Sequence, residues 1–146
     1  MRKATARQPI PLQPPERLHF EIGGFAGHSW EITWVEGRLW YRENPNGQGQ
    51  LAWLPWKPFI EPSVLEWEAL DEQLTRAAVW RWPRHVSDPE VLDGTQWALS
   101  IRWGTRRKTI SGSNAFPAGF QELEEALRGL ATRPDPNREE VEELPG

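Results

Sequence analysis

Alternation of apolar and polar residues marks the first part of this chain as strands. The alternation occupies three stretches, at 18–22, 30–34 and 39–41, each separated from the next by glycine-containing turns. Apolar residues at every second position are typical of a strand that buries one face. A fourth apolar stretch at 51–56 allows a further strand, which Pro55 would restrict to a sheet edge. The pattern therefore predicts a sheet built from this part of the chain.

Helical spacing replaces the alternation after residue 62. Ser63 and Glu66 stand three residues apart, which is the spacing of a capping box at a helix start. The predicted apolar face of this helix consists of Trp67, Leu70 and Leu74. A second helix is predicted after Pro117, a residue that suits the first helical turn. Its predicted buried stripe consists of Phe120, Leu123, Leu127 and Leu130.

A hairpin is the clearest local prediction. Residues 97–103 alternate strictly, and Gly104-Thr105 has the form of a two-residue type II′ turn leading into 106–111. The resulting register places small Gly112 opposite Trp97, which leaves room for the indole to lie across the backbone. The same register places Arg102 opposite Arg107, an unfavourable pair unless an acidic group is near. A short strand is also predicted at 78–82, ended by Pro83.

The predicted order is strands, a helix, a strand, a hairpin and a helix. It indicates an α+β fold, in which one mainly antiparallel sheet carries both helices on one face in a single two-layer domain. We expect this domain at 17–131. Residues 1–16 are predicted to form a disordered proline-rich arm, and 132–146 a disordered acidic tail.

Composition narrows the possible functions. The 146 residues include ten tryptophans and no cysteine, so disulfides, thiolate nucleophiles and zinc–thiolate sites are excluded. The basic N-terminal residues lead into prolines without the apolar stretch of a signal peptide, and no apolar run approaches the length of a membrane span. We therefore expect a cytoplasmic protein without a membrane segment.

Several short segments between residues 62 and 130 form a recognisable pattern. They are Pro62-Ser63, Trp67, Val79-Trp80-Arg81-Trp82, Asp93-Gly94-Thr95-Gln96-Trp97, Leu99, Ile101, Gly112-Ser113-Asn114-Ala115-Phe116-Pro117 and Phe120. On these residues the chain resembles a family of small bacterial proteins that has no established activity, and the resemblance covers about half of the chain. His85 stands where the family pattern has a tyrosine. The resemblance implies a small α+β domain and no particular reaction.

An uneven charge distribution suggests a binding surface. The formal net charge is −4, yet residues 76–108 contain seven basic and three acidic side chains, a local balance of +4. Tryptophan beside arginine is a composition favoured at protein-binding hot spots. Alternatively, Arg106 and Trp103 form only an intramolecular cation–π pair. The predicted binding residues are Trp82, Trp103, Arg81, Arg84, Arg102, Arg106 and Arg107.

Three functional hypotheses follow, ranked by how much of the sequence supports each. The first is a non-enzymatic protein-binding module, of an accessory, inhibitor or immunity type, whose partner has an acidic surface. The second is binding of nucleic acid or another anionic ligand through residues 76–108, which the negative total charge weakens. The third is an enzyme, which would require His85, Asp93 and Asn114 to meet in one cleft. No cofactor, metal site or catalytic residue is predicted, because the histidines and the loop acids lack ligand or triad spacing.

Overall fold

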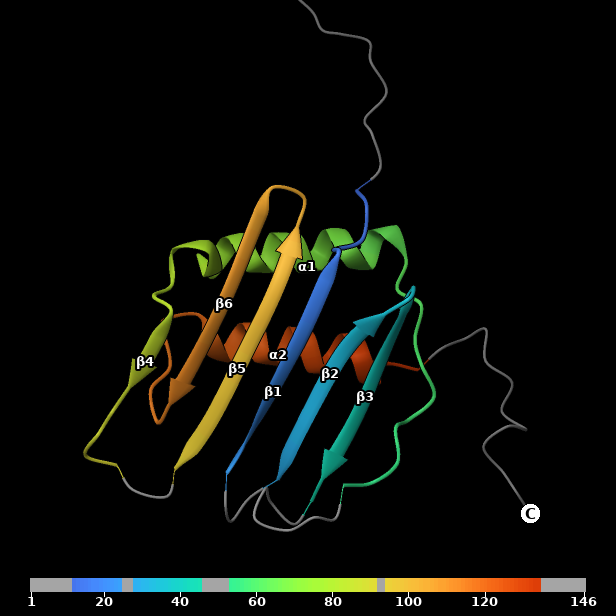
Figure 1. Ribbon diagram of the computed structural model, residues 1–146. Coiled ribbons are helices and arrows are strands. Elements are labelled where there is room, and N and C mark those ends of the chain that lie inside the picture. The colour runs from blue at the N-terminus through green and yellow to red at the C-terminus, as the bar shows by residue number, and fades with distance from the viewer. Residues whose placement is uncertain (1–11, 25–27, 46–52, 92–93, 135–146) are drawn as a thin grey trace, which may run out of the picture.

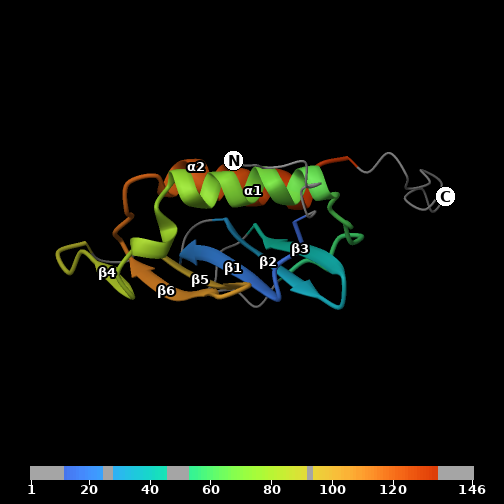
Figure 2. The same cartoon turned by 90° about the horizontal axis from the view of Figure 1, so that it is seen from above.

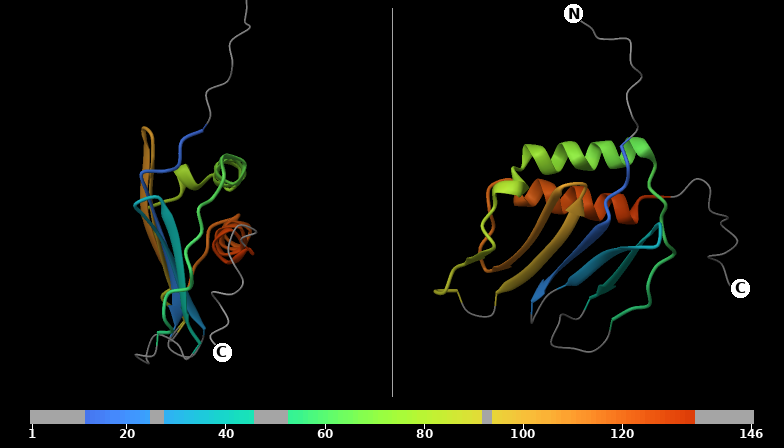
Figure 3. Two further views of the ribbon diagram at one scale, coloured as in Figure 1. Left: turned by 90° about the vertical axis from the view of Figure 1, so that its right-hand side faces the viewer. Right: turned by 45° about the horizontal axis from the view of Figure 1, so that its top comes forward.

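The computed structural model describes residues 12–24, 28–45, 53–91 and 94–134, which form a two-layer α+β domain (Figure 1). Six strands make one sheet in the order β3-β2-β1-β5-β6-β4. Two helices, α1 (Val64–Arg76) and α2 (Phe120–Thr132), lie side by side on one face of it (Figures 2 and 3). The strands are β1 (Arg17–Gly24), β2 (Ser29–Val35), β3 (Arg38–Asn44), β4 (His85–Ser87), β5 (Thr95–Trp103) and β6 (Arg106–Ser113).

The predicted fold class is confirmed, and the sheet is mainly antiparallel. Among the described strands only the short strand β4, which the sequence did not predict, pairs in parallel, with β6. The central pair is β1 with β5, two strands between which all elements from β2 to β4 lie along the chain. Alternation places one face of each strand under the helices, where Phe20 and Leu99 are each 1% exposed. None of the described helices is long and apolar enough to cross a membrane.

The predicted hairpin register is confirmed at every pair from Trp103 opposite Arg106 to Trp97 opposite Gly112. Gly104 has a φ of 64°, the left-handed conformation that the first position of this turn needs. The Trp97 indole lies directly over Gly112, and its Nε1–H donates to the Ala115 carbonyl at 2.9 Å. The indole can occupy this position because Gly112 has no side chain.

Helix α1 begins with the predicted capping box and is tied to the end of α2. The Glu66 amide donates to the Ser63 hydroxyl at 3.2 Å, and the Ser63 amide donates back to Glu66 Oε1 at 2.9 Å. Arg133, just after α2, donates two hydrogen bonds to the same carboxylate. This bidentate pair lowers the pKa of Glu66, and burial opposes it only in part.

Replacing Glu66 by glutamine should destabilise the fold in a pH-dependent way. Glutamine can still accept the cap hydrogen bond, but it loses the charge that Arg133 pairs with. Because the folded-state pKa is lowered, the carboxylate stabilises the fold above the unfolded-state pKa, and this is lost as pH falls through the folded-state pKa. We expect a cost of about 1 kcal/mol at pH 7 that disappears in acid, measured by urea unfolding across pH. An equal cost at all pH values would contradict this account.

The strand predicted at 78–82 is wrong. Residues Val79–Arg81 form a 3-10 helix, η1, entered through Ala78 at a φ of 59°. The buried side chains are Val79 and Trp82, at 0% and 5% exposure, and three-residue spacing places them together in the core. The two indoles at 80 and 82, which alternation would have placed on one face, are therefore separated.

The stretch around Pro55 follows the outer edge of β3 without forming a regular strand. The Leu54 amide donates to the Glu43 carbonyl and the Lys57 amide to the Tyr41 carbonyl, at 2.9 and 2.8 Å. Further along, Ile60 makes a ladder bridge to Leu39. The predicted edge position is confirmed for residues 53–56, and the predicted strand is wrong there. Residues 51 and 52 lie outside the described part.

Two boundaries also differ from the prediction. Helix α2 begins at Phe120, after Gly119 with a φ of 87°, and Pro117 lies in the preceding turn. Ala131 is fully buried in this helix, whereas Leu130 is only partly buried. At the N-terminal side, residues 12–16 pack on the domain, since the Gln13 carbonyl accepts a hydrogen bond from Trp103 at 2.8 Å. The remainder of the predicted arm, 1–11, and the tail from 135 lie outside the described residues.

Candidate functional site: the open face of the sheet

The two tryptophans predicted to form a binding surface are in the core. Trp82 is 5% exposed and Trp103 is 4% exposed, so the predicted exposure of both is wrong. Each indole N–H is satisfied internally, Trp82 by the Ala77 carbonyl at 3.0 Å and Trp103 by Gln13. Their rings pack edge-on against other indoles, Trp82 on Trp97 and Trp103 on Trp67. A partner cannot reach them without unfolding the domain.

Arg106 also has an internal role. Its guanidinium forms an ion pair with Asp71 of α1 at 3.0 Å and lies 4.7 Å from the Trp80 ring centroid. The predicted contact with Trp103 exists at a longer distance, 5.9 Å. Arg106 thus connects β6 to α1 on the helix-covered side. Arg81, the last residue of η1, and Arg84, just before β4, are both exposed.

Arg102 and Arg107 remain exposed, and the fold adds a third arginine to them. Arg17 lies opposite Arg102 in the β1–β5 pairing, and Arg102 lies opposite Arg107 in the hairpin. These three side chains form one row across three adjacent strands, which we call the arginine row. The row lies on the sheet face that no described helix covers, near the hairpin turn (Figure 1). Directly opposed side chains of this kind are only about 5 Å apart at Cβ.

No carboxylate of the described residues neutralises the arginine row. In this part of the chain none lies within 4.0 Å of the three guanidinium groups, although Arg42, Arg76, Arg106 and Arg133 all have carboxylate partners. Arg17 Nε donates to the Ser100 hydroxyl at 2.7 Å, which is a neutral acceptor. Glu16, the neighbouring acid, accepts from the Gly104 amide instead. The row is therefore a concentration of uncompensated positive charge.

Further along the same face, the charges compensate one another. His19 Nε2 lies 3.0 Å from Glu21 and 3.4 Å from Glu31, and Arg42 Nε donates to Glu31 at 2.6 Å. The hydrogen bond with His19 lowers the pKa of Glu21, against the opposing effect of burial. The ligand atoms of His19, Glu21 and Glu31 lie within 4.8 Å of one another, so these residues could hold a cation. Arg42 already forms an ion pair with Glu31, and His19 forms a hydrogen bond with Glu21, so these side chains form an internal polar network.

Aromatic rings border this network at the edge of the sheet. The Arg42 guanidinium lies 4.4 Å from the Trp53 ring centroid and 4.5 Å from that of Trp56. Trp56 is 39% exposed, and Trp40 packs on Phe59 at 5.3 Å. These cation–π contacts fix Arg42 in place and leave one indole face at the surface.

The residues considered for catalysis are occupied by structural contacts. His85 Nδ1 lies 2.8 Å from the Ser111 hydroxyl, and Asn114 Nδ2 donates to the Val91 carbonyl at 3.0 Å. Asn114 has a φ of 62°, a left-handed conformation that asparagine tolerates better than most residues. Asp88 accepts from the Glu90 amide at 3.1 Å, a local turn contact. Asp93 lies outside the described residues.

Arg17 is the site residue that sequence reasoning missed. Its position next to Leu18 in the alternation already places it on the open face, out of phase with the buried residues. Its neighbour across the strands could not be predicted, because the β1–β5 pairing joins Arg17 to a residue about 85 positions further along the chain.

Comparison of the chain with known proteins gives no match, either to a protein-family model or to a curated protein.

Proposed function

We propose that this protein is a non-enzymatic binding module whose arginine row binds an acidic surface of a partner protein. Arg17, Arg102 and Arg107 are the residues that would contact the partner. The single observation that supports this proposal is three arginines aligned on one exposed face without an ion-pair partner among the described residues. Guanidinium groups bind carboxylates in bidentate geometry, so a row of them suits a surface rich in aspartate and glutamate.

The arginine row costs stability in the isolated protein. Like charges placed directly opposite across strands are destabilising, whereas opposite charges contribute roughly 0.2–1 kcal/mol. A sheet face with no binding role would gain from an acid at the central position. An acidic partner would remove the repulsion and add charge-assisted hydrogen bonds on an otherwise flat, accessible surface.

The variant Arg102→Glu should separate binding from stability. The introduced carboxylate would lie between Arg17 and Arg107, so we expect the variant to be about 0.5–1 kcal/mol more stable in urea unfolding. The affinity of the same variant for the partner should fall by at least roughly tenfold, since the substitution removes one cation and inserts an anion. Partner retention is measured by quantitative affinity capture from nuclease-treated lysate of the source cells, comparing wild type with the variant.

Arg76→Glu is the control for partner retention, because it makes the same charge change at an exposed position on α1. It also breaks the Arg76–Glu72 ion pair, so its stability is not compared with that of Arg102→Glu. Wild type and this control should retain the same partner, and Arg102→Glu should not. If Arg102→Glu retains everything that wild type retains, the arginine row is not the binding surface. If Arg102→Glu is less stable than wild type, the repulsion argument is wrong.

A second candidate is binding of single-stranded nucleic acid on the same face. The observation that favours it is Trp56, an exposed indole bordering a face that also carries arginines, because bases stack on such rings. The net charge of −4 opposes it. A labelled oligonucleotide titrated at several salt concentrations distinguishes the two. Affinity that falls steeply with salt and needs both Arg102 and Trp56 would replace the protein-partner proposal.

A further inference from the structure

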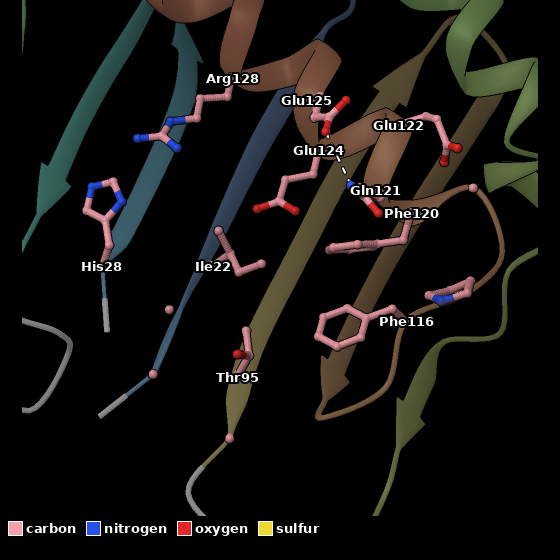
Figure 4. A pocket seen from close by; sticks show the side chains of 15 residues that line it. Ile22, His28, Thr95, Phe116, Phe120, Gln121, Glu122, Glu124, Glu125 and Arg128 are labelled. Atoms are coloured by element: carbon pink, nitrogen blue, oxygen red, sulfur yellow. Dashed lines mark hydrogen bonds between the residues drawn. The ribbon is translucent and has the colours of Figure 1, made fainter. Parts of the chain in front are cut away.

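A separate cavity of about 880 Å³ opens on the helix-covered side of the sheet. It lies where the first turns of α2 cross the end of β1 and the start of β5, at the opposite end of these strands from the arginine row (Figures 1 and 4). Its volume falls within the range of small-molecule sites. This cavity has no part in the proposed partner binding.

One wall of the cavity is apolar. The Phe116 and Phe120 rings pack together with centroids 5.0 Å apart, and Ile22 of β1 lies across from them (Figure 4). Phe120 is fixed in the core, whereas Phe116 is 48% exposed. An exposed phenyl ring held against a buried one is a preformed surface for the hydrocarbon part of a ligand.

Glu124 is the polar group aimed into this cavity. Its side chain descends from α2 over Ile22 and is half-buried (Figure 4). No lysine, arginine or histidine nitrogen of the described residues lies within 4.0 Å of its carboxylate. Burial raises the pKa of Glu124, and the nearby charge of Arg128 and the Trp30 indole N–H oppose this rise only in part. The carboxylate is therefore desolvated without a direct cationic partner in the part of the chain that the structure describes.

The basic groups near the cavity are already engaged elsewhere. Arg128 Nε donates to the Tyr41 hydroxyl at 3.3 Å, and His28 Nε2 lies 3.7 Å from Glu43. The Tyr41 hydroxyl in turn donates to Glu43 at 2.8 Å. Figure 4 shows the Arg128 guanidinium and the His28 ring on the side of Glu124 away from the two phenyl rings.

Two further carboxylates, on Glu122 and Glu125, are exposed around the cavity and increase its negative charge. Gln121 donates to Glu125 at 3.4 Å and holds it at the rim. The site thus combines a negative field with an apolar wall. That combination favours a ligand with a positive charge at one end and hydrocarbon at the other.

We propose that this cavity binds a small organic amine, with its ammonium group on Glu124 and its apolar part on Phe116 and Phe120. The ammonium replaces water at a carboxylate that has lost part of its hydration, and it restores charge balance there. The two rings exclude water from the hydrocarbon part of the ligand.

The test is calorimetric titration of the full chain with 2-phenylethylammonium, 2-phenylethanol and phenylacetate, which share a phenyl body and differ in charge. We expect the amine to bind with a Kd of roughly millimolar or tighter, and the alcohol and the carboxylate at least about tenfold more weakly. Glu124→Gln should weaken amine binding by about tenfold or more. Phe116→Ala should weaken it by a smaller factor.

Glu68→Gln, at an exposed position of α1, is the control and should bind the amine as wild type does. Thermal unfolding of Glu124→Gln checks that the variant is folded, and we expect it to be, because glutamine matches the shape and removes a desolvated charge. Equal binding of phenylacetate and the amine, unchanged binding by folded Glu124→Gln, or no binding by wild type would each overturn the proposal. A lysine side chain of a peptide could present the same ammonium. Tighter binding of a blocked lysine peptide than of the free amine would overturn the small-ligand assignment.

Discussion

Gly112→Ala should lose about 3 kcal/mol of unfolding free energy, because the added methyl group would overlap a buried indole ring. A Cβ at this position would lie 2.0 Å from Trp97 Nε1 and 2.3 Å from Cε2. Such contacts require the ring to move. The ring is held by its hydrogen bond to Ala115 and by Phe120, whose centroid is 4.6 Å away. Movement would break the hydrogen bond and disturb the packing under α2 together.

Gly129→Ala is the matched control for this prediction. Gly129 lies within α2, and no neighbouring atom of the described structure lies within 4 Å of a Cβ built on it. We therefore expect Gly129→Ala to stabilise the protein by roughly 0.5–1 kcal/mol, through helix propensity. Urea unfolding of both variants under one condition measures the contrast. If Gly112→Ala were as stable as wild type, the indole would not be fixed over the backbone.

Local pattern predicted much of this fold because the forces involved act between near neighbours. The Gly104-Thr105 turn fixes the hairpin register, and so the positions of Gly112 opposite Trp97 and Arg102 opposite Arg107 followed from counting residues. The Ser63 capping box likewise depends on residues only three apart. In both cases the local sequence and the tertiary fold favour the same structure.

The errors occur where tertiary packing decides between local alternatives. At residues 79–82, the sequence is compatible with both strand alternation and three-residue helical spacing. Burial of Val79 together with Trp82 favours the 3-10 helix. The arginine row depends on β1 pairing with β5, a long-range choice that no local signal specifies. The cavity beside Glu124 depends on where α2 crosses the sheet, which is also a tertiary property. The candidate sites were therefore harder to predict than the elements that carry them.

The question of which tryptophans are core residues has a direct test in Trp103→Ala. The sequence predicted a binding role for Trp103, but its ring is 4% exposed in the core, so its truncation should cost about 3–5 kcal/mol in urea unfolding. The change removes an edge-on contact with Trp67, at 5.9 Å between centroids, and leaves a cavity beneath α1. It also removes the hydrogen bond to Gln13, which attaches the segment preceding β1 to the domain.

Two further variants divide the cost of Trp103→Ala into its physical parts. Trp103→Phe keeps most of the apolar volume and loses the hydrogen bond to Gln13, so it should cost clearly less than alanine. Trp56→Ala truncates an indole that is 39% exposed and should cost no more than roughly 1 kcal/mol, the value of its contact with Arg42. If Trp103→Ala were instead as mild as Trp56→Ala, the Trp103 ring would contribute little to the stability of the core. A cost several times larger for Trp103 than for Trp56 would confirm that the Trp103 indole stabilises the hydrophobic core, where it is 4% exposed and packs edge-on against Trp67.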